Sequence, residues 1–299
     1  MKTTYLIFIS LLTVIFLSSC ADLDDVAFFG EKIDQYKFDD YENPNASFTL
    51  GSTYDIPDSN IHLFTMQSKL PSESSSTTIY AVYVGSMATI TQDTIIVYMH
   101  GQGDHMDAYW HRTKLLANTG GKNRYGVLTI DYRGFGLSEG KSSEESLYED
   151  ARTALRWLKN KGVDKSKVMM YGFSLGCIPS IKLCADFDEY KPAKLMIEAP
   201  IGSVQNITEE SLIINVQGSF FTNNEFDNAG NMQRVNQPLQ WFHGTADNYI
   251  KIDQGELVYS QYNGVYKEAY RIQGAEHGNI PNVMGLFEYE EAVLDFITK

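Results

Sequence analysis

The sequence is poor in basic residues, in cysteine and in long apolar runs. Among 299 residues, 24 are Lys or Arg and 38 are Asp or Glu, which gives a formal net charge of -14. Because such a chain repels phosphate backbones, we expect no nucleic-acid partner. The three cysteines do not have the spacing of a zinc site, so we expect no metal either. The rest of the composition, 43% hydrophobic, is that of a globular chain that can bury a core.

A strongly apolar stretch lies at the N-terminus. Residues Tyr5 to Leu17 are nearly all apolar, follow Lys2 and are too short to span a membrane comfortably. The stretch ends in Leu17-Ser18-Ser19-Cys20 and resembles a bacterial lipoprotein signal, removed as residues 1–19 and leaving Cys20 to carry the lipid. The resemblance implies a membrane anchor through Cys20 on the bacterial cell envelope, periplasmic or surface-exposed. The alternatives are a plain signal peptide and an uncleaved anchor.

Beyond the signal we predict an acidic tether, residues 20–46, and one domain, residues 47–299. Acidic residues outnumber lysines eight to two between Ala21 and Glu42, which favours a solvated linker. Cys177 and Cys184 stand seven positions apart on a predicted helix, about 10 Å along its axis. That separation is too large for a disulfide, so we interpret both as core thiols.

Runs of apolar and β-branched residues alternate with helical patterns along the domain. Because unbroken apolar runs are typical of strands buried on both faces, they predict a mostly parallel sheet of about eight strands, flanked by helices. The predicted strands are Ile61 to Met66, Thr78 to Val84, Thr94 to Met99, Val127 to Ile130, Val168 to Tyr171, Leu195 to Ile197, Leu239 to Phe242 and Tyr270 to Ile272.

Three helices are predicted from apolar residues at helical spacing. One carries Leu147 to Leu158, with Ser142 and Glu145 as a capping box; the others begin at Leu175 and span Leu286 to Ile297. The connection between Pro200 and Pro238 is too long for such a sheet, so we predict a short insert at about 201–236. Its apolar residues fit a lid or pocket wall and fit an ordinary helix equally well.

The sequence Gly172-Phe173-Ser174-Leu175-Gly176 joins a predicted strand directly to a predicted helix. A G-x-S-x-G turn at such a junction exposes a serine hydroxyl at the carboxyl edge of the sheet, and glycines avoid clashes on either side. The pattern alone arises by chance in many chains, but this context makes Ser174 the predicted nucleophile. The backbone N–H groups of Leu175 and of Gln102, which follows His100-Gly101, are the predicted oxyanion donors.

A serine nucleophile needs a base and an acid that orients the base. His243 and His277 are the histidines that follow Ser174, and His277 lies in the loop before the last helix, where the base is expected. Asp247, in the loop after the preceding strand, is the predicted acid, with Glu198 and Asp227 as rivals. We interpret His243 and His100 as structural.

The ordered motifs resemble those of the α/β-hydrolase superfamily. They are His100-Gly101, Asp131-Tyr132-Arg133-Gly134-Phe135-Gly136, the Ser174 turn, His243-Gly244-Thr245-Ala246-Asp247 and His277. The lysophospholipase-like, serine-aminopeptidase-like and dienelactone-hydrolase-like branches are the most similar. The resemblance implies an α/β-hydrolase fold and a cofactor-free serine hydrolase, with Ser174, Asp247 and His277 as catalytic residues. The chain departs from many relatives at Gln102 to His105, in the loop after His100-Gly101. It also departs at Asn248 to Lys251, where many relatives have Val-Pro.

The expected reaction is the hydrolysis of a small-molecule, lipid or carbohydrate ester through an acyl-enzyme on Ser174. An aspartate nucleophile, as in dehalogenases and epoxide hydrolases, is ruled out by Ser174. Three alternatives stay open: a serine peptidase or aminopeptidase, a haloperoxidase-like activity that uses the same triad, and a non-catalytic surface binding lipoprotein on the same fold.

Overall fold

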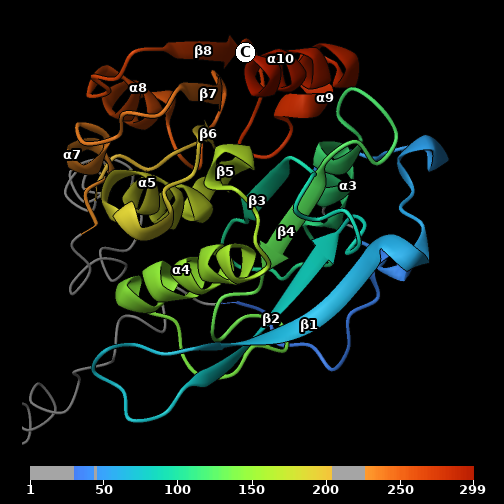
Figure 1. Cartoon of the computed structure of the whole chain (residues 1–299). Helices are drawn as coiled ribbons and strands as arrows, with labels where there is room; N and C mark the ends of the chain where they lie inside the picture. Colours follow the sequence, from blue (N-terminus) through green and yellow to red (C-terminus); the bar gives the residue numbers. More distant parts are fainter. Residues whose placement is uncertain (1–29, 44–45, 204–225) are drawn as a thin grey trace, which may run out of the picture.

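A twisted sheet forms the centre of the molecule (Figure 1). The structure, a computed structural model, describes residues 30–43, 46–203 and 226–299. Within them the sheet has eight strands in the order β1-β2-β4-β3-β5-β6-β7-β8. Their bounds are β1 Ile61–Ser68, β2 Thr77–Val84, β3 Ile95–Met99, β4 Gly126–Ile130, β5 Val168–Phe173, β6 Lys194–Glu198, β7 Leu239–Gly244 and β8 Lys267–Ile272.

Strand β2 pairs antiparallel with β1 and β4, and the strands from β4 to β8 pair in parallel. The predicted fold, a mostly parallel eight-stranded sheet of the α/β-hydrolase type, is therefore confirmed. All carboxyl ends of β3 to β8 point to one edge, where loops from different strands can meet.

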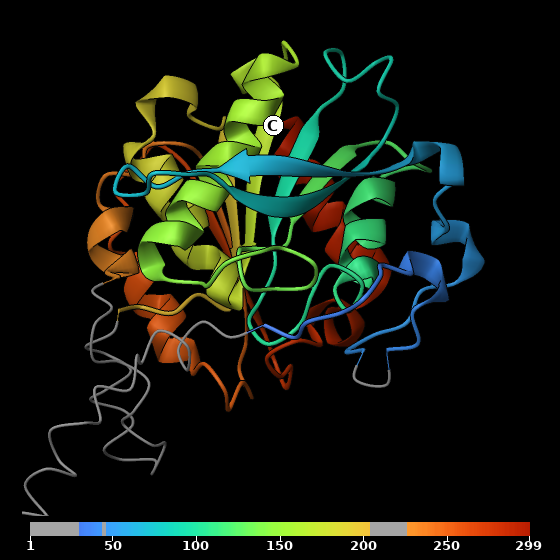
Figure 2. The same ribbon diagram turned by 90° about the horizontal axis from the view of Figure 1, so that it is seen from below.

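Helices cover both faces of the sheet (Figures 1 and 2). On one face α4, α5, α7 and α8 share a core cluster with Ile95, Val97 and Met99 of β3, and on the other α3, α9 and α10 share one with Ile96 and Tyr98. This alternation explains why β3 is apolar at every position. The helices are α3 Trp110–Asn118, α4 Glu144–Asn160, α5 Cys177–Asp186, α7 Asn228–Met232, α8 Ile252–Ser260, α9 Ile280–Met284 and α10 Leu286–Thr298.

The start of α4 corrects the predicted capping box by one residue. Ser143, not Ser142, is the N-cap: its hydroxyl accepts from the Ser146 N–H at 3.2 Å, and the Ser146 hydroxyl accepts from the Ser143 N–H at 2.7 Å. Glu145 stays exposed. Ser146 is buried beside the cap, and its short side chain reaches back to the Ser143 N–H, which closes the box.

The predicted tether is wrong for its second half. Residues 30–43 pack against the domain: Gly30 pairs with Gly103 and Lys32 with Gly136 in parallel bridges. Tyr36 and Phe38 also contact the core cluster that α3 and α10 share. These aromatic side chains gain more from burial than the surrounding acidic residues gain from solvation, so the folded domain includes residues 30–43.

Other predictions lie partly outside the described residues. These are the signal segment 1–19, Cys20, residues 21–29 of the tether, and positions 204–225 of the predicted insert. The described end of the insert, from Phe226, forms α7 and a bridge between Ser203 and Asp227. Cys177 and Cys184 are buried and free. In the described part of the chain, no helix combines the length and apolarity that a membrane crossing requires.

Candidate active site

The turn from β5 into α5 holds Ser174 in a strained backbone. Its φ of 52° is left-handed, a conformation that costs a non-glycine residue about 1–3 kcal/mol. The glycines on either side are sterically required. A Cβ on Gly176 would lie 2.0 Å from the carbonyl oxygen of Met99, and one on Gly172 would lie 2.6 Å from that of Gly176. Close packing of β3 against this turn therefore forces the strain onto Ser174.

The structure brings Ser174, His277 and Asp247 together. The Oγ of Ser174 lies 2.9 Å from Nε2 of His277, and Nδ1 of His277 lies 2.8 Å from Oδ2 of Asp247. Asp247 follows β7 and His277 follows β8, so α8 and β8 occupy the thirty positions between them. The three side chains form one continuous chain of hydrogen bonds at the carboxyl edge of the sheet.

Asp247 is held as a carboxylate. Its side chain is fully buried, and its Oδ1 accepts from the backbone N–H groups of Tyr249 and Ile250 at 2.9 and 2.8 Å. Burial raises the pKa, but hydrogen bonds from His243 and His277, with the N–H of Ile250, outweigh it and hold the pKa well below its usual range. A buried negative charge beside Nδ1 stabilises a protonated His277 ring.

The rival acids have other partners. Both carboxylate oxygens of Glu198 accept from the Arg112 guanidinium at 2.9 Å, while Asp227 caps α7 through the Gly230 N–H. His243 lies beside Asp247, and its Nε2 is 2.8 Å from the carbonyl oxygen of Ile250. His243 therefore fixes the loop that carries Asp247, as expected of a structural histidine.

Sequence reasoning missed Arg112. This fully buried residue of α3 also donates to the carbonyl of Gly278 at 2.7 Å, next to His277, and its guanidinium stacks 4.1 Å from the Phe173 ring. Desolvation lowers the pKa of Arg112, yet the charge of Glu198 overrides it and the pKa is raised. Since the pairing depends on side chains 86 positions apart, no local pattern could have revealed it.

The loop of residues 100–107, called the oxyanion loop below, lies beside the Ser174 turn. The contact of Gly176 with Met99 places Leu175 next to its start, and the Tyr109 hydroxyl donates to the carbonyl of Gln102 at 3.0 Å. His100 is buried, with Nε2 3.1 Å from Asp131, and braces the loop as expected. The oxyanion role of Gln102 and Leu175 remains a prediction.

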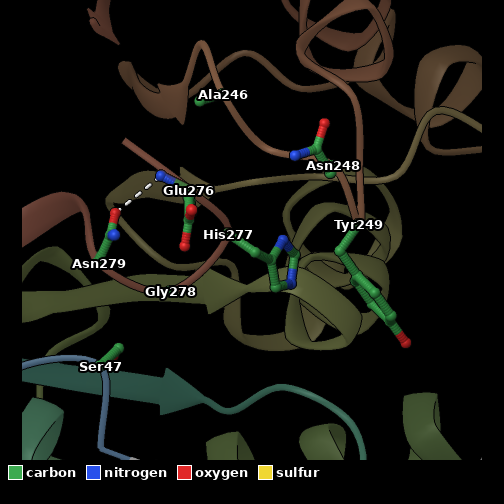
Figure 3. Close-up of a pocket in the computed structure, with 8 residues that line it drawn as sticks. All are labelled: Ser47, Ala246, Asn248, Tyr249, Glu276, His277, Gly278 and Asn279. Carbon is green, nitrogen blue, oxygen red and sulfur yellow. Dashed lines mark hydrogen bonds between the residues drawn. The ribbon is translucent and has the colours of Figure 1, made fainter. Parts of the chain in front are cut away.

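A pocket of about 590 Å³ opens beside His277 (Figure 3). Figure 3 shows Glu276 between Asn279 and His277, while Tyr249 extends from the opposite side. The Tyr249 ring lies 4.9 Å from the His277 ring, and the residue as a whole is 65% exposed. The lining also includes Ser47, Ala246, Asn248 and Gly278. Most of the lining residues thus carry a polar group, and one of them, Glu276, carries a carboxylate.

Comparisons with known proteins agree with this architecture. Residues 91–228 match the family model described as serine aminopeptidase, S33, a range that includes Ser174 and ends before Asp247. The human protein ABHD12B is 31% identical over 196 residues, 60% of this chain and 52% of that protein. The Caenorhabditis elegans α/β hydrolase domain-containing protein aho-3 is 27% identical over 62% of this chain and 52% of that protein. The chain thus spans about half the length of these two relatives.

Solved structures share the fold at low sequence identity. The Pyrococcus furiosus esterase Pf2001 superimposes with a TM-score of 0.64 at 15% identity, covering 90% of this chain and 98% of that one. The esterase RhEst1 from Rhodococcus sp. ECU1013 gives 0.58 at 16% identity, covering 80% and 99%. Together with the strand order, these likenesses show that the chain has the α/β-hydrolase fold.

Proposed function

We propose that the protein is a serine hydrolase that cleaves carboxylic esters through an acyl-enzyme on Ser174. The hydrogen-bonded chain from Ser174 through His277 to Asp247 is the observation that carries the proposal. The esterases among the solved structures of the same fold support it. The proposal adds the bond cleaved and the residues that cleave it to the shared fold.

In each half of the reaction His277 takes up one proton and then releases it. As the Ser174 oxygen attacks the ester carbon, Nε2 takes the hydroxyl proton and the carbonyl oxygen becomes an oxyanion, held by the N–H groups of Gln102 and Leu175. Nε2 then gives that proton to the alcohol oxygen as the carbon–oxygen bond breaks. Water repeats the sequence on the acyl-enzyme, which releases the acid and restores Ser174.

The proposed activity is tested by the hydrolysis of p-nitrophenyl esters from acetate to octanoate. We expect turnover by the wild type and a loss of at least a thousandfold in Ser174→Ala, because the acyl-enzyme cannot form. A folded wild type that releases no more p-nitrophenol than Ser174→Ala contradicts the proposal and favours a binding protein on the same fold.

Amide hydrolysis is the second candidate, since the matching family model is described as serine aminopeptidase. Aminoacyl p-nitroanilides test cleavage of the amide bond. Like the p-nitrophenyl esters, they release a coloured nitroaromatic product, so the two rates can be compared. We expect faster cleavage of the esters by kcat/KM. Preferential cleavage of an aminoacyl anilide would assign the peptidase activity instead.

The pocket beside His277 supports a polar leaving group. Because His277 must deliver its proton to the leaving oxygen, the leaving alcohol has to lie on the His277 side of Ser174, where the pocket is. Its walls offer the amides of Asn248 and Asn279 and the exposed carboxylate of Glu276. These groups favour an alcohol that is cationic or donates hydrogen bonds, and disfavour an anionic one.

Acetylcholine and 3,3-dimethylbutyl acetate test this selectivity, because the two esters differ in charge at nearly constant shape. We expect wild type to prefer acetylcholine, and Glu276→Gln to reduce the ratio of the two kcat/KM values about fivefold, equivalent to about 1 kcal/mol. Glu291→Gln, at an exposed position on α10, is the matched control and should leave the ratio unchanged. An unchanged ratio in Glu276→Gln would show that the pocket does not hold the leaving group.

A further inference from the structure

The described N-terminal segment lies against the oxyanion loop. Residues 30–43, called the strap here, cross the same end of the molecule as this loop (Figure 2). The backbone N–H of Glu31 donates to the carbonyl of Gly103 at 3.0 Å, in the middle of the loop. The carbonyl of Glu31 in turn accepts from the N–H of Gly136 at 2.7 Å. One strap residue thus joins the oxyanion loop to the loop that follows β4.

A buried carboxylate connects the strap to both ends of the oxyanion loop. Asp131 is fully buried, and its Oδ1 accepts from the backbone N–H of Met106 at 2.8 Å and lies 3.1 Å from Nε2 of His100. The other oxygen, Oδ2, accepts from the hydroxyl of Tyr36 at 2.5 Å. The strap therefore supplies the donor for one oxygen, while the loop supplies the donors for the other.

A second carboxylate makes the complementary contact. Asp107, at the end of the oxyanion loop, accepts from the backbone N–H groups of Lys37 and Phe38 at 2.7 and 2.9 Å. Behind it, the Phe38 ring packs 4.7 Å from the Trp110 ring of α3. The strap is thus fixed to the loop by backbone and side-chain bonds on both sides of Tyr36.

Loss of the Tyr36 hydroxyl would leave one oxygen of a buried carboxylate without its donor. Such a carboxylate shifts toward another donor or admits water, and the groups bonded to it shift with it. Here those groups are His100 and Met106, which delimit the backbone of Gln102. Oxyanion donors act only at the right geometry, and a misplacement of about 1 Å can cost a hundredfold in rate.

We propose that the strap is part of the catalytic scaffold and that Tyr36 is a positioning residue for the oxyanion loop. The inference rests on the proposed function, because it concerns how well the loop stabilises an oxyanion on the substrate. The strap then supports the active site and also connects the domain to the residues before position 30.

Tyr36→Phe in the full chain tests the inference against a matched control. Tyr54→Phe also removes a phenol that donates to a carboxylate, that of Glu290, far from the oxyanion loop in the chain and attached to α10. Active sites are titrated with a fluorophosphonate, and kcat and KM are measured with p-nitrophenyl acetate. Affinity for a trifluoromethyl ketone reports on the oxyanion donors, since the hemiketal that it forms with Ser174 carries the same oxyanion.

We expect Tyr36→Phe to lower kcat about tenfold, with KM within twofold, and to weaken the ketone by a similar factor. Tyr54→Phe should keep wild-type kcat and ketone affinity even where it lowers Tm. If Tyr36→Phe does not fold, Asp107→Asn, which removes one of the two acceptor oxygens, should show the same pattern at smaller size.

A variant that melts earlier yet keeps wild-type kcat and ketone affinity overturns the inference, since the strap would then only stabilise the fold. Labelling distinguishes a failure of the proposed function from a failure of the role of Tyr36. A wild type that the fluorophosphonate does not label overturns the proposed function and the inference with it. A labelled wild type with an unaffected Tyr36→Phe overturns the inference alone.

Discussion

At the scale of single residues, the site depends on where one proton is held. Ser174 has a left-handed backbone that aims its hydroxyl at His277, and His277 is held from its far side by Asp247. His277 is part-exposed, whereas Asp247 is fully buried. Because the charge of Asp247 cannot be screened by solvent, it fixes the tautomer of His277 and lowers the cost of protonating the ring.

Replacing Asp247 by asparagine tests that electrostatic role. Asp247→Asn keeps the size of the side chain but removes its charge and can present an amide to Nδ1 of His277. We expect kcat at pH 7 to fall by about a thousandfold or more, with a smaller change in KM. Steady-state kinetics on an ester that wild type cleaves, with circular dichroism as the folding control, measure the effect; a loss below tenfold would assign the orienting role elsewhere.

The same residue predicts a pH dependence of stability. Hydrogen bonds hold the folded-state pKa of Asp247 below its unfolded value of about 3.9, despite burial. A depressed pKa stabilises the fold above the unfolded value, and that contribution disappears as the pH falls toward the folded one. The difference in unfolding free energy between wild type and Asp247→Asn should therefore shrink from pH 5 to pH 2. A difference that is constant over this range would contradict the assignment.

Sequence predicted the residues whose chemistry is local and missed those that act at a distance. Ser174 lies in a short motif, and His277 and Asp247 each follow a strand at the expected point, so their meeting could be inferred. Arg112 and Tyr36 carry no motif, and their partners lie 86 and 95 positions away. Asp131 belongs to a motif that was recognised, but its role as the common acceptor of loop and strap depends on tertiary contacts.

At the scale of elements, one buried ion pair joins three parts of the site. Arg112 of α3 binds Glu198 at the end of β6 and the carbonyl of Gly278 in the loop of His277. The hydroxyl of Tyr171, in β5, also donates to Glu198, at 2.5 Å. The position of the base loop relative to the nucleophile strand therefore depends on a buried cation.

Removing one partner of this pair should lower the free energy of unfolding far more than removing both. We expect Arg112→Met to destabilise the protein by about 3–5 kcal/mol, because the Glu198 carboxylate stays buried without its partner. Arg112→Met/Glu198→Leu should recover most of that loss. The ester hydrolysis rate should recover less than the stability, since the Gly278 carbonyl still lacks its donor. Urea unfolding and kcat, measured on both variants, provide the comparison.

The exposed pair of Arg271 and Glu256 is the control for this cycle. Arg271→Met should change stability by about 1 kcal/mol or less, because both side chains are about 40% exposed and their attraction is screened. Equal losses in Arg112→Met and Arg271→Met would show that the Arg112 pair is not a structural tie.

Among the elements, strands were easier to predict than helices. The strands buried on both faces are mostly apolar, and all eight strands were predicted to within a few residues. Helix α3 was missed because it is buried almost all round and includes Arg112, Thr113 and Asn118 among its buried residues, which hides the helical period. Helix α9 is short, at five residues, and gives little periodic signal.

At the scale of the whole molecule, the folded domain extends further toward the N-terminus than composition suggested. The acidic residues of the strap predicted a solvated linker, but Asp39 accepts from the indole of Trp110 and pairs with Lys114. Charge density alone misleads where aromatic residues alternate with acids, because the rings supply the burial and the acids find partners at the rim.

We propose that the molecule is anchored to the bacterial envelope through lipid on Cys20, a residue outside the described part of the chain. Expressed in a bacterial host, wild type should partition into the detergent phase of Triton X-114, and Cys20→Ala should not be lipidated. Mass spectrometry of the N-terminal peptide identifies the acyl chains. A wild type recovered in the aqueous phase with an unmodified Cys20 would contradict the anchor. The catalytic proposal would be unaffected by that result.

The central claim is that Ser174 is a nucleophile activated by His277, and covalent labelling tests it most directly. Intact-mass spectrometry after exposure to a fluorophosphonate should show one adduct per chain in wild type, mapped to Ser174. Labelling should be lost in Ser174→Ala and slowed by at least a hundredfold in His277→Ala. A folded wild type that stays unlabelled, or that is labelled equally well without His277, would contradict the account.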